Sequence, residues 1–252
     1  MNNKAQIFFH TFSYKIFFYL FFATFILQIL FWTKTENIKP EYNLLPNIPS
    51  PSLIRATSLG DDEFLFRIFA TRIQNAGDIF AGFVSLKNYD YAKLYDWLVI
   101  LDDLSPKSNF TPAMASYYFG QTQKKQDTIH IVKYLEKRAD KDLNSNWWWL
   151  YQAIYLATNS LEDKDLALRL AHKLSENNAT DAPLWSKQMP AFIHAEYGEN
   201  CAAFQIIQNM IAENNSGSHK FSAQEMDFMR FFINTRLMKL KNDNFNPKNC
   251  KK

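Results

Sequence analysis

The sequence predicts an all-α protein, with one membrane-spanning helix near the N-terminus followed by a stack of helical hairpins. An uncharged apolar run covers residues 16–32. The chain has 6 Gly and 9 Pro among 252 residues, which is few for a turn-rich β-sandwich. Helical patterns recur at a spacing of 36 residues, from Asp127 to Asp163 to Glu199. Apolar residues make up 47% of the chain, enough for a packed core.

The apolar run IFFYLFFATFILQILFW has the length of a membrane anchor. At about 1.5 Å per residue its helix spans about 26 Å, close to a hydrocarbon core of about 30 Å. Tyr14, Tyr19 and Trp32 are suited to the two interfaces. A cleaved signal peptide is the alternative, because a charged start precedes the run; no Ala-x-Ala-like site follows it, so we favour an uncleaved anchor. Residues 1–15 then form a short N-terminal segment.

The orientation of this single-pass anchor depends on a small difference in charge. Lys4 and Lys15 precede the span, and Lys34 and Lys39 follow it. The terminal amine adds one positive charge to the first side, which favours an inside N-terminus. We therefore expect the bulk of the chain on the outer side of the membrane, which in a bacterium is the periplasm.

Two polar segments bound the expected helical domain at residues 58–240. Residues 33–57 contain Pro40, Pro46, Pro49 and Pro51, which exclude a continuous helix and predict an extended spacer. Residues 241–252 are polar and predict a disordered tail.

Within the domain, each repeat is expected to be a pair of helices, A and B. On helix B, small or aliphatic residues at positions i and i+4 form one apolar stripe; these are Ile131 with Leu135, Ala167 with Ala171, and Ala203 with Ile207. The preceding A helices align Trp149, Trp185 and Phe221. Pro190 predicts a kink or break in the second of these, and Ser222 to Glu225 form a capping-box pattern.

This pattern resembles the tetratricopeptide (TPR-like) repeat. The likeness is best in residues 147–177 and 184–214 and weaker in 111–139, and it rests on the aromatic residue of helix A and the small residues of helix B. The Leu-Gly pair after the tryptophan and the proline after helix B are missing. The resemblance implies an α-solenoid whose A helices line a concave surface that binds peptides or proteins.

Candidate partner-binding residues follow from this expectation. Trp147, Trp148 and Trp149 are successive helix positions about 100° apart, so they cannot share one face. Trp149 is expected in the core, leaving Trp147 or Trp148 for the groove or for packing between repeats. Tyr117 poses the same question one repeat earlier. Three polar side chains of the first helix could hydrogen-bond the carboxylate or backbone of a peptide, namely Arg67, Arg72 and Gln74. The alternative is that all three are simply exposed to solvent.

Other classes of site have no visible signature. The five histidines do not cluster, and no catalytic, cofactor or metal motif is recognisable, so we expect neither catalysis nor a cofactor. A net charge of +3 does not indicate nucleic acid. Cys201 is expected to be a small buried helix position, and a disulfide with Cys250 is less favoured than two free thiols.

The sequence therefore favours a membrane-anchored scaffold or adaptor that binds another protein or peptide at the cell envelope. An envelope enzyme or accessory acting on glycan or lipid stays open, and would need carboxylates beside the aromatic residues; Glu136, Glu162 and Glu196 are not adjacent to them in sequence. Homo-oligomerisation through the last helix is the third alternative.

Overall fold

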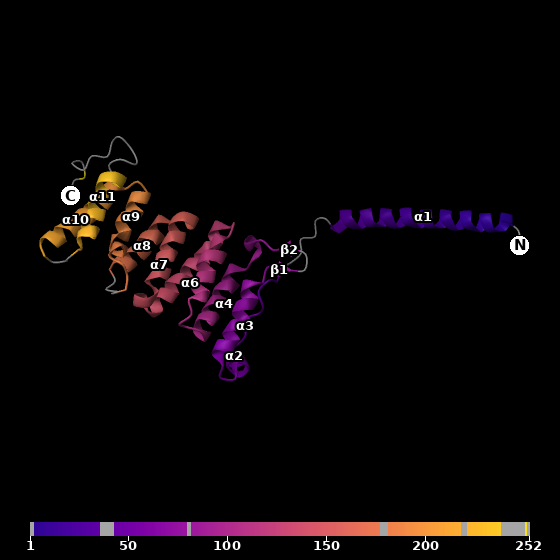
Figure 1. Cartoon of the computed structure of the whole chain (residues 1–252), viewed down its shortest axis with the longest axis horizontal. Coiled ribbons are helices and arrows are strands. Elements are labelled where there is room, and N and C mark those ends of the chain that lie inside the picture. Colours follow the sequence, from indigo (N-terminus) through magenta and orange to yellow (C-terminus); the bar gives the residue numbers. More distant parts are fainter. Residues whose placement is uncertain are drawn as a thin grey trace. The chain divides into compact units, whose positions relative to one another are not determined.

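The computed structural model describes residues 3–35, 43–79, 82–176, 181–217, 221–237 and Cys250, with the backbone alone for 3–14, 79 and 236. The chain divides into two compact units, residues 1–43 and 44–252. Among the described residues the structure is almost entirely helical, as predicted (Figure 1).

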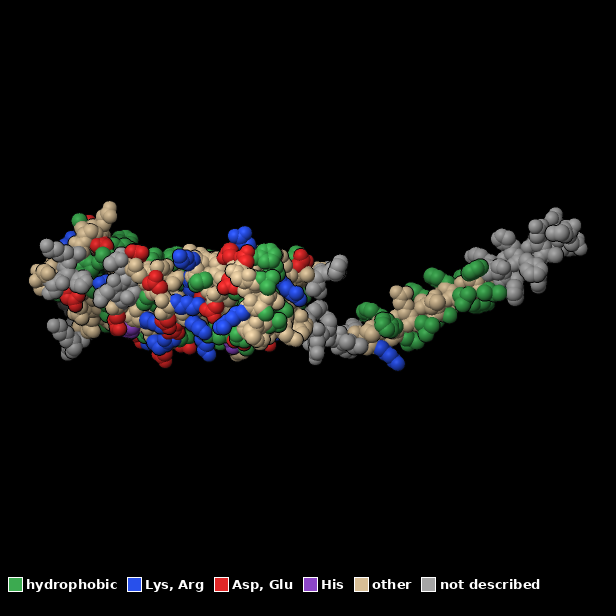
Figure 2. All heavy atoms as spheres, turned by 90° about the horizontal axis from the view of Figure 1, so that it is seen from below, with side chains coloured by type: hydrophobic (Ala, Val, Ile, Leu, Met, Phe, Trp, Pro, Cys, Tyr) green, Lys and Arg blue, Asp and Glu red, His purple; other side chains and the backbone are tan. Residues whose placement is uncertain are grey.

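The first unit contains helix α1 (Asn3–Thr35). The helix begins well before the predicted span, so the expected separate segment 1–15 belongs to the same helix from Asn3 onward. Residues Lys15–Thr35 have a mean hydropathy of 2.0 and are long and apolar enough to cross a membrane. Figure 2 shows hydrophobic side chains along the visible face of the described part of α1, and the large ones from Ile16 to Trp32 are exposed.

The second unit begins within the predicted spacer, at Leu44 rather than residue 58. Leu45 is buried, and its carbonyl accepts a 2.9 Å hydrogen bond from the Lys93 ammonium. The Trp97 indole donates to the Pro46 carbonyl at 2.9 Å. Ser50 then caps α2 (Pro51–Ser58), which starts at a proline. The spacer is thus not extended throughout: its second half packs on the domain, and residues 36–42 lie outside the described part.

The remaining helices of the second unit follow one another in a row, each packing on its neighbours in the chain (Figure 1). They are α3 (Asp62–Gln74), α4 (Tyr91–Leu104), α5 (Phe110–Ala113), α6 (Thr128–Lys141), α7 (Leu143–Leu156), α8 (Lys164–Ser175), α9 (Met189–Glu196), α10 (Asn200–Asn215) and α11 (Ala223–Phe231). Two hydrophobic clusters of side chains fill the space between them, one reaching from Leu45 to Ile193 and one around α9 to α11.

Short irregular elements extend several of these helices. π-Helical segments continue α5, α7 and α11: η2 (Met114–Tyr118), η5 (Ala157–Leu161) and η7 (Phe232–Leu237). The 3-10 segments are η1 (Leu86–Asn88), η3 (Phe119–Gln121), η4 (Lys125–Asp127) and η6 (Leu184–Gln188). The connection before α4 also holds a small antiparallel hairpin, β1 (Asp78–Ile79) and β2 (Gly82–Phe83), which the sequence did not predict.

The predicted helix signals have clear positions. Asp127, Asp163 and Glu199 are the N-cap residues of α6, α8 and α10. All six aligned positions of the B-helix stripes are fully buried: Ile131, Leu135, Ala167, Ala171, Ala203 and Ile207. The break at Pro190 is confirmed, because the 3-10 segment η6 ends there and α9 begins with Pro190 in its first turn. The capping box of Ser222 and Glu225 is also confirmed.

The expectation for the cysteines is wrong. Cys201 is exposed on α10 and forms a disulfide with Cys250, with the two Cα atoms 5.2 Å apart. The buried stripe of α10 contains Ala203, and a position two residues earlier lies about 200° around the helix, on the solvent side. Cys250, at the end of the expected disordered tail, is therefore attached to α10, whereas residues 241–249, 251 and 252 lie outside the described part.

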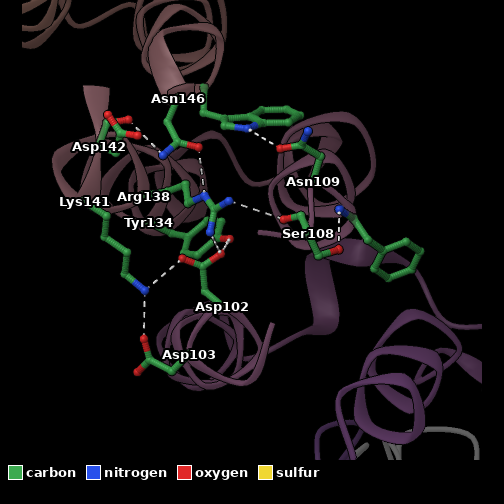
Figure 3. A network of polar contacts seen from close by, with 11 residues as sticks. Asp102, Asp103, Ser108, Asn109, Tyr134, Arg138, Lys141, Asp142 and Asn146 are labelled. Carbon is green, nitrogen blue, oxygen red and sulfur yellow. Dashed lines mark hydrogen bonds and ion pairs between the residues drawn. The ribbon is translucent and has the colours of Figure 1, made fainter. Parts of the chain in front are cut away.

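A buried polar network joins α4, α6 and α7 (Figure 3). Arg138 donates to Asp102 at 2.9 Å and to the Asn146 side chain at 3.1 Å, and Tyr134 donates to the same Asp102 oxygen at 3.1 Å. Burial, followed by the charge of Asp102, raises the pKa of Tyr134 well above its usual value. Lys141 contacts the other Asp102 oxygen and Asp103; although partial desolvation lowers its pKa, the two carboxylates outweigh that effect and raise it. The network fixes the register of three helices.

Charged side chains of both signs are interspersed on the face of the unit seen in Figure 2. The Glu136 carboxylate of α6 accepts two hydrogen bonds from the Arg169 guanidinium of α8, at 2.6 and 2.8 Å, and one from the Lys173 ammonium at 2.9 Å. Hydrogen bonding from Arg169 lowers the pKa of Glu136 to about 2. These ion pairs connect α6 to α8.

Candidate binding groove

A cleft of about 590 Å³, the main cleft, lies against helices α7, α9 and α11. Five aromatic side chains line it: Tyr151, Tyr155, Trp185, Phe192 and Phe228. Aliphatic and other apolar residues complete its walls, namely Ile154, Pro183, Leu184, Met189 and Ile193. Its volume lies within the range of about 300–1,000 Å³ that is usual for ligand pockets.

Ring contacts hold these aromatic walls together. Tyr151 meets Trp185 with ring centroids 5.2 Å apart, which joins α7 to η6. Phe192 meets Phe228 at 6.1 Å, which joins α9 to α11. Both contacts are edge-to-face, the geometry that aromatic pairs prefer. The cleft is therefore lined by side chains that already pack against each other between successive helices.

Local helix chemistry places these residues on one side. Tyr151 and Tyr155 are four positions apart on α7, so they lie one turn apart on the same face. The π-helical segment η5 continues this helix and brings Thr158 and Asn159 to the lining. π-Helical insertions are frequent at functional sites. Pro190 lies in the first turn of α9, and Phe192, two residues later, lines the same cleft.

A second cleft of about 370 Å³, the tyrosine cleft, shares Tyr151 and Tyr155 with the main cleft, and we call the two together the groove. Two predicted candidates meet here: the Trp148 indole donates a 2.9 Å hydrogen bond to the Tyr117 hydroxyl. Trp148 is 37% exposed and Tyr117 is 54% exposed. The structure thus brings Trp148 and Tyr117 together on the surface of the groove.

The other candidates are scattered. Trp147 is partly buried, with its ring 5.8 Å from Trp185, so it packs behind the lining. Gln74 lines a separate cleft of about 330 Å³ beside the hairpin. Arg67 pairs with Glu63 on the surface of α3, and Arg72 is exposed on the same helix. Neither arginine is among the lining residues of the three clefts.

The aligned tryptophans differ in their surroundings. Trp149 is only 6% exposed, as expected of a core residue, and its indole donates to the Asn109 side chain at 3.2 Å. Trp185, its equivalent at the 36-residue spacing, is only half-buried and lines the main cleft. The difference arises because η6 is a 3-10 turn, in which side chains do not follow the α-helical phase of α7.

The groove has the chemistry of a binding surface. Its main cleft combines aromatic and aliphatic walls with a few polar groups, among them Gln188, Glu196 and Glu225. Among the described residues, no group of three or more His, Cys, Asp or Glu is placed to hold a metal ion. What the arrangement can do is bury apolar side chains of a ligand and orient them by a small number of hydrogen bonds.

Sequence reasoning missed most of the lining: Tyr151, Tyr155, Phe192, Glu196 and Phe228. A signal was present, since Trp148, Tyr151 and Tyr155 recur at helical spacing on the A helix that precedes Asp163. Comparison of the chain with protein-family models, with curated proteins and with solved structures gives no match, so the chemistry of the groove is argued from its own residues.

Proposed function

We propose that this chain is a membrane-anchored helical-repeat scaffold whose groove binds a segment of another protein. The observation that carries the proposal is the groove itself, an apolar and largely aromatic cleft on the A side of successive helices. Exposed aromatic surface costs free energy in water, and tyrosine and tryptophan are enriched among residues that dominate protein interfaces.

A solenoid of TPR-like pairs is supported by the 36-residue pattern. The three acidic residues that the pattern aligns are the N-cap residues of α6, α8 and α10. The six stripe positions that it aligns are buried. Polar contacts also recur at this separation: Arg138 with Asp102 and Ser116 with Gln152 are both 36 residues apart. In a stack of repeats, each unit contacts the equivalent part of its neighbour.

The proposed location is the outer side of the membrane. Helix α1 supplies the candidate span. The Cys201–Cys250 disulfide supports an outer location, because disulfides persist in the periplasm and outside cells but are rare in the cytosol. Tethering then raises the effective concentration of the groove near other envelope proteins, so a weak interaction suffices.

Glycan binding is the second candidate, and one observation favours it: Glu196 and Glu225 do lie beside the aromatic residues in the main cleft. Glu136 and Glu162 do not, since they pair with Arg169 and Lys125. The aliphatic walls contributed by Leu184, Ile193 and their neighbours favour peptide side chains over sugar hydroxyls, which would lose hydrogen bonds to water there.

The test is photo-crosslinking in the native host, with benzoyl-phenylalanine in place of Tyr155 in the full-length chain. The control places the same group at His172, which is exposed on α8 outside the groove. We expect one reproducible adduct with another envelope protein from Tyr155 and not from His172. Equal adducts from both positions, or none from Tyr155, would contradict the proposal; an adduct with a second copy would support self-assembly instead.

A further inference from the structure

Among the described residues, the charged side chains that line the main cleft have one sign. They are two carboxylates, Glu196 and Glu225, and the described lining holds neither Lys nor Arg. The charged residues expected from sequence to meet a ligand were arginines, Arg67 and Arg72, but these lie outside the groove. The groove therefore has the polarity opposite to one that captures a peptide carboxylate.

The two glutamates lie beside the aromatic pair that joins α9 to α11. Glu196 follows Phe192 by four residues on α9, and Glu225 precedes Phe228 by three residues on α11. Each carboxylate is thus about one turn from one ring of the Phe192–Phe228 pair. A cation placed between them would meet negative charge and aromatic faces together.

The position of Glu225 is fixed before any ligand arrives. Its Oε2 atom accepts hydrogen bonds from the backbone N–H and the hydroxyl of Ser222, both at 2.8 Å. This capping box orients the carboxylate at the N-terminus of α11. Because the side chain is already ordered, a cation binding there loses little additional conformational entropy.

We propose that the segment bound in the main cleft carries a Lys or Arg side chain next to bulky apolar residues. The inference rests on the proposed protein-binding function and specifies the occupant. The apolar residues pack on Tyr155, Trp185 and Phe192, and the cation pairs with Glu196 and Glu225 beside Phe228. Glu225 is half-buried, where a charge pair is stronger than in bulk water, and a cation over an aromatic ring adds attraction. Acidic segments are disfavoured by repulsion.

The test uses a library of random 12-residue peptides displayed on phage. Peptides that bind the full-length protein in detergent micelles are retained. Peptides that also bind the Phe228→Ala variant, which lacks an exposed lining side chain, are discarded because they bind elsewhere. We expect the remaining peptides to be enriched in aromatic or aliphatic residues with a neighbouring Lys or Arg. In a selected peptide, replacing that basic residue by Glu should weaken binding at least about tenfold.

The Glu196→Gln/Glu225→Gln double variant separates charge from packing, since Gln retains a capping box. We expect the basic enrichment to disappear and the Lys-to-Glu effect to fall below about threefold, equivalent to about 0.7 kcal/mol. Glu176→Gln, at an exposed glutamate outside the groove, is the matched control and should leave the preference unchanged.

The possible failures are distinguishable. Groove-dependent peptides without basic residues, or a basic preference that survives in the double variant, would overturn the charge inference and leave the proposed function standing. An absence of any peptides that depend on Phe228 would overturn both. If no peptide is selected and the wild-type protein retains oligosaccharides in a parallel binding experiment, the glycan alternative is supported and the peptide inference is overturned.

Discussion

The buried ion pair between Asp102 and Arg138 provides the sharpest test of the packing. Asp102 is 2% exposed and accepts from Arg138, Tyr134 and Lys141. Replacing it by Asn preserves the volume but leaves the buried Arg138 guanidinium without its carboxylate. Removing one partner of a buried pair costs about 3–5 kcal/mol, mainly because the remaining charge is uncompensated. We therefore expect Asp102→Asn to lower the free energy of unfolding by about 3 kcal/mol or more.

The adjacent residue supplies a matched control. Asp103 also pairs with Lys141, at 2.8 Å, but its side chain is 65% exposed. Exposed pairs contribute about 0–1 kcal/mol, so Asp103→Asn should cost less than about 1 kcal/mol. The two substitutions remove the same charge from successive residues of α4, and they differ in burial and in the contacts of Asp102 with Arg138 and Tyr134.

The assay is urea unfolding of the full-length chain in detergent, followed by tryptophan fluorescence. With a slope of about 2–3 kcal/mol per molar urea, the expected loss moves the midpoint down by about 1 M or more for Asp102→Asn. The double variant Asp102→Leu/Arg138→Met should be less destabilised than Asp102→Asn alone, because neither charge is left buried. Equal midpoints for Asp102→Asn and Asp103→Asn would refute the reasoning.

Three further predictions concern pH, the tryptophans and the disulfide. Since Arg169 lowers the pKa of Glu136 from 4.5 to about 2, the contribution of this pair to the free energy of unfolding is complete above about pH 4.5 and is lost as pH falls towards 2. The shift corresponds to about 3 kcal/mol, which solvent screening reduces to about 1–2 kcal/mol. The measurement is the pH dependence of the difference in stability between the wild type and Glu136→Gln. Trp149→Ala should cost about 3–5 kcal/mol in the same unfolding assay, whereas Trp148→Ala, on the groove surface, should cost clearly less; similar losses would show that both are core residues. Cys250→Ser opens a loop of 49 residues and should destabilise α10 and α11 by up to about 4 kcal/mol. The loss should appear as faster amide hydrogen exchange in these two helices. Unchanged exchange would contradict a disulfide in the native protein.

Much of the helical organisation was predictable because it depends on local chemistry. An apolar run and a capping residue influence only the backbone within a few residues. Helix α1, the α11 capping box and the N-cap at Asp163 can therefore be inferred from the sequence. Helix α4 (Tyr91–Leu104) has equally local signals. Its apolar residues recur at helical spacing between a capping aspartate, Asp90, and a serine.

Features that depend on distant contacts were missed. Helical spacing alone does not say whether an aromatic residue meets another helix or an open cleft, so Trp149 and Trp185 looked equivalent. The packing of Leu45 and Pro46 depends on Lys93 and Trp97, more than forty residues later in the chain. No local pattern reports such a contact, and prolines in that stretch fit an extended spacer equally well.

The same contact has a mechanical consequence. Because Leu44 is the first residue of the folded unit, tension applied through the segment after α1 reaches the domain at its junction with α4. Three hydrogen bonds, two from Lys93 to Leu45 and Asn47 and one from Trp97 to Pro46, would carry that load first, together with the buried side chain of Leu45. A modest pull would detach residues 44–50 and lengthen the tether while α4 and the later helices stay folded. The length of chain between α1 and the folded helices is then set by force as well as by sequence.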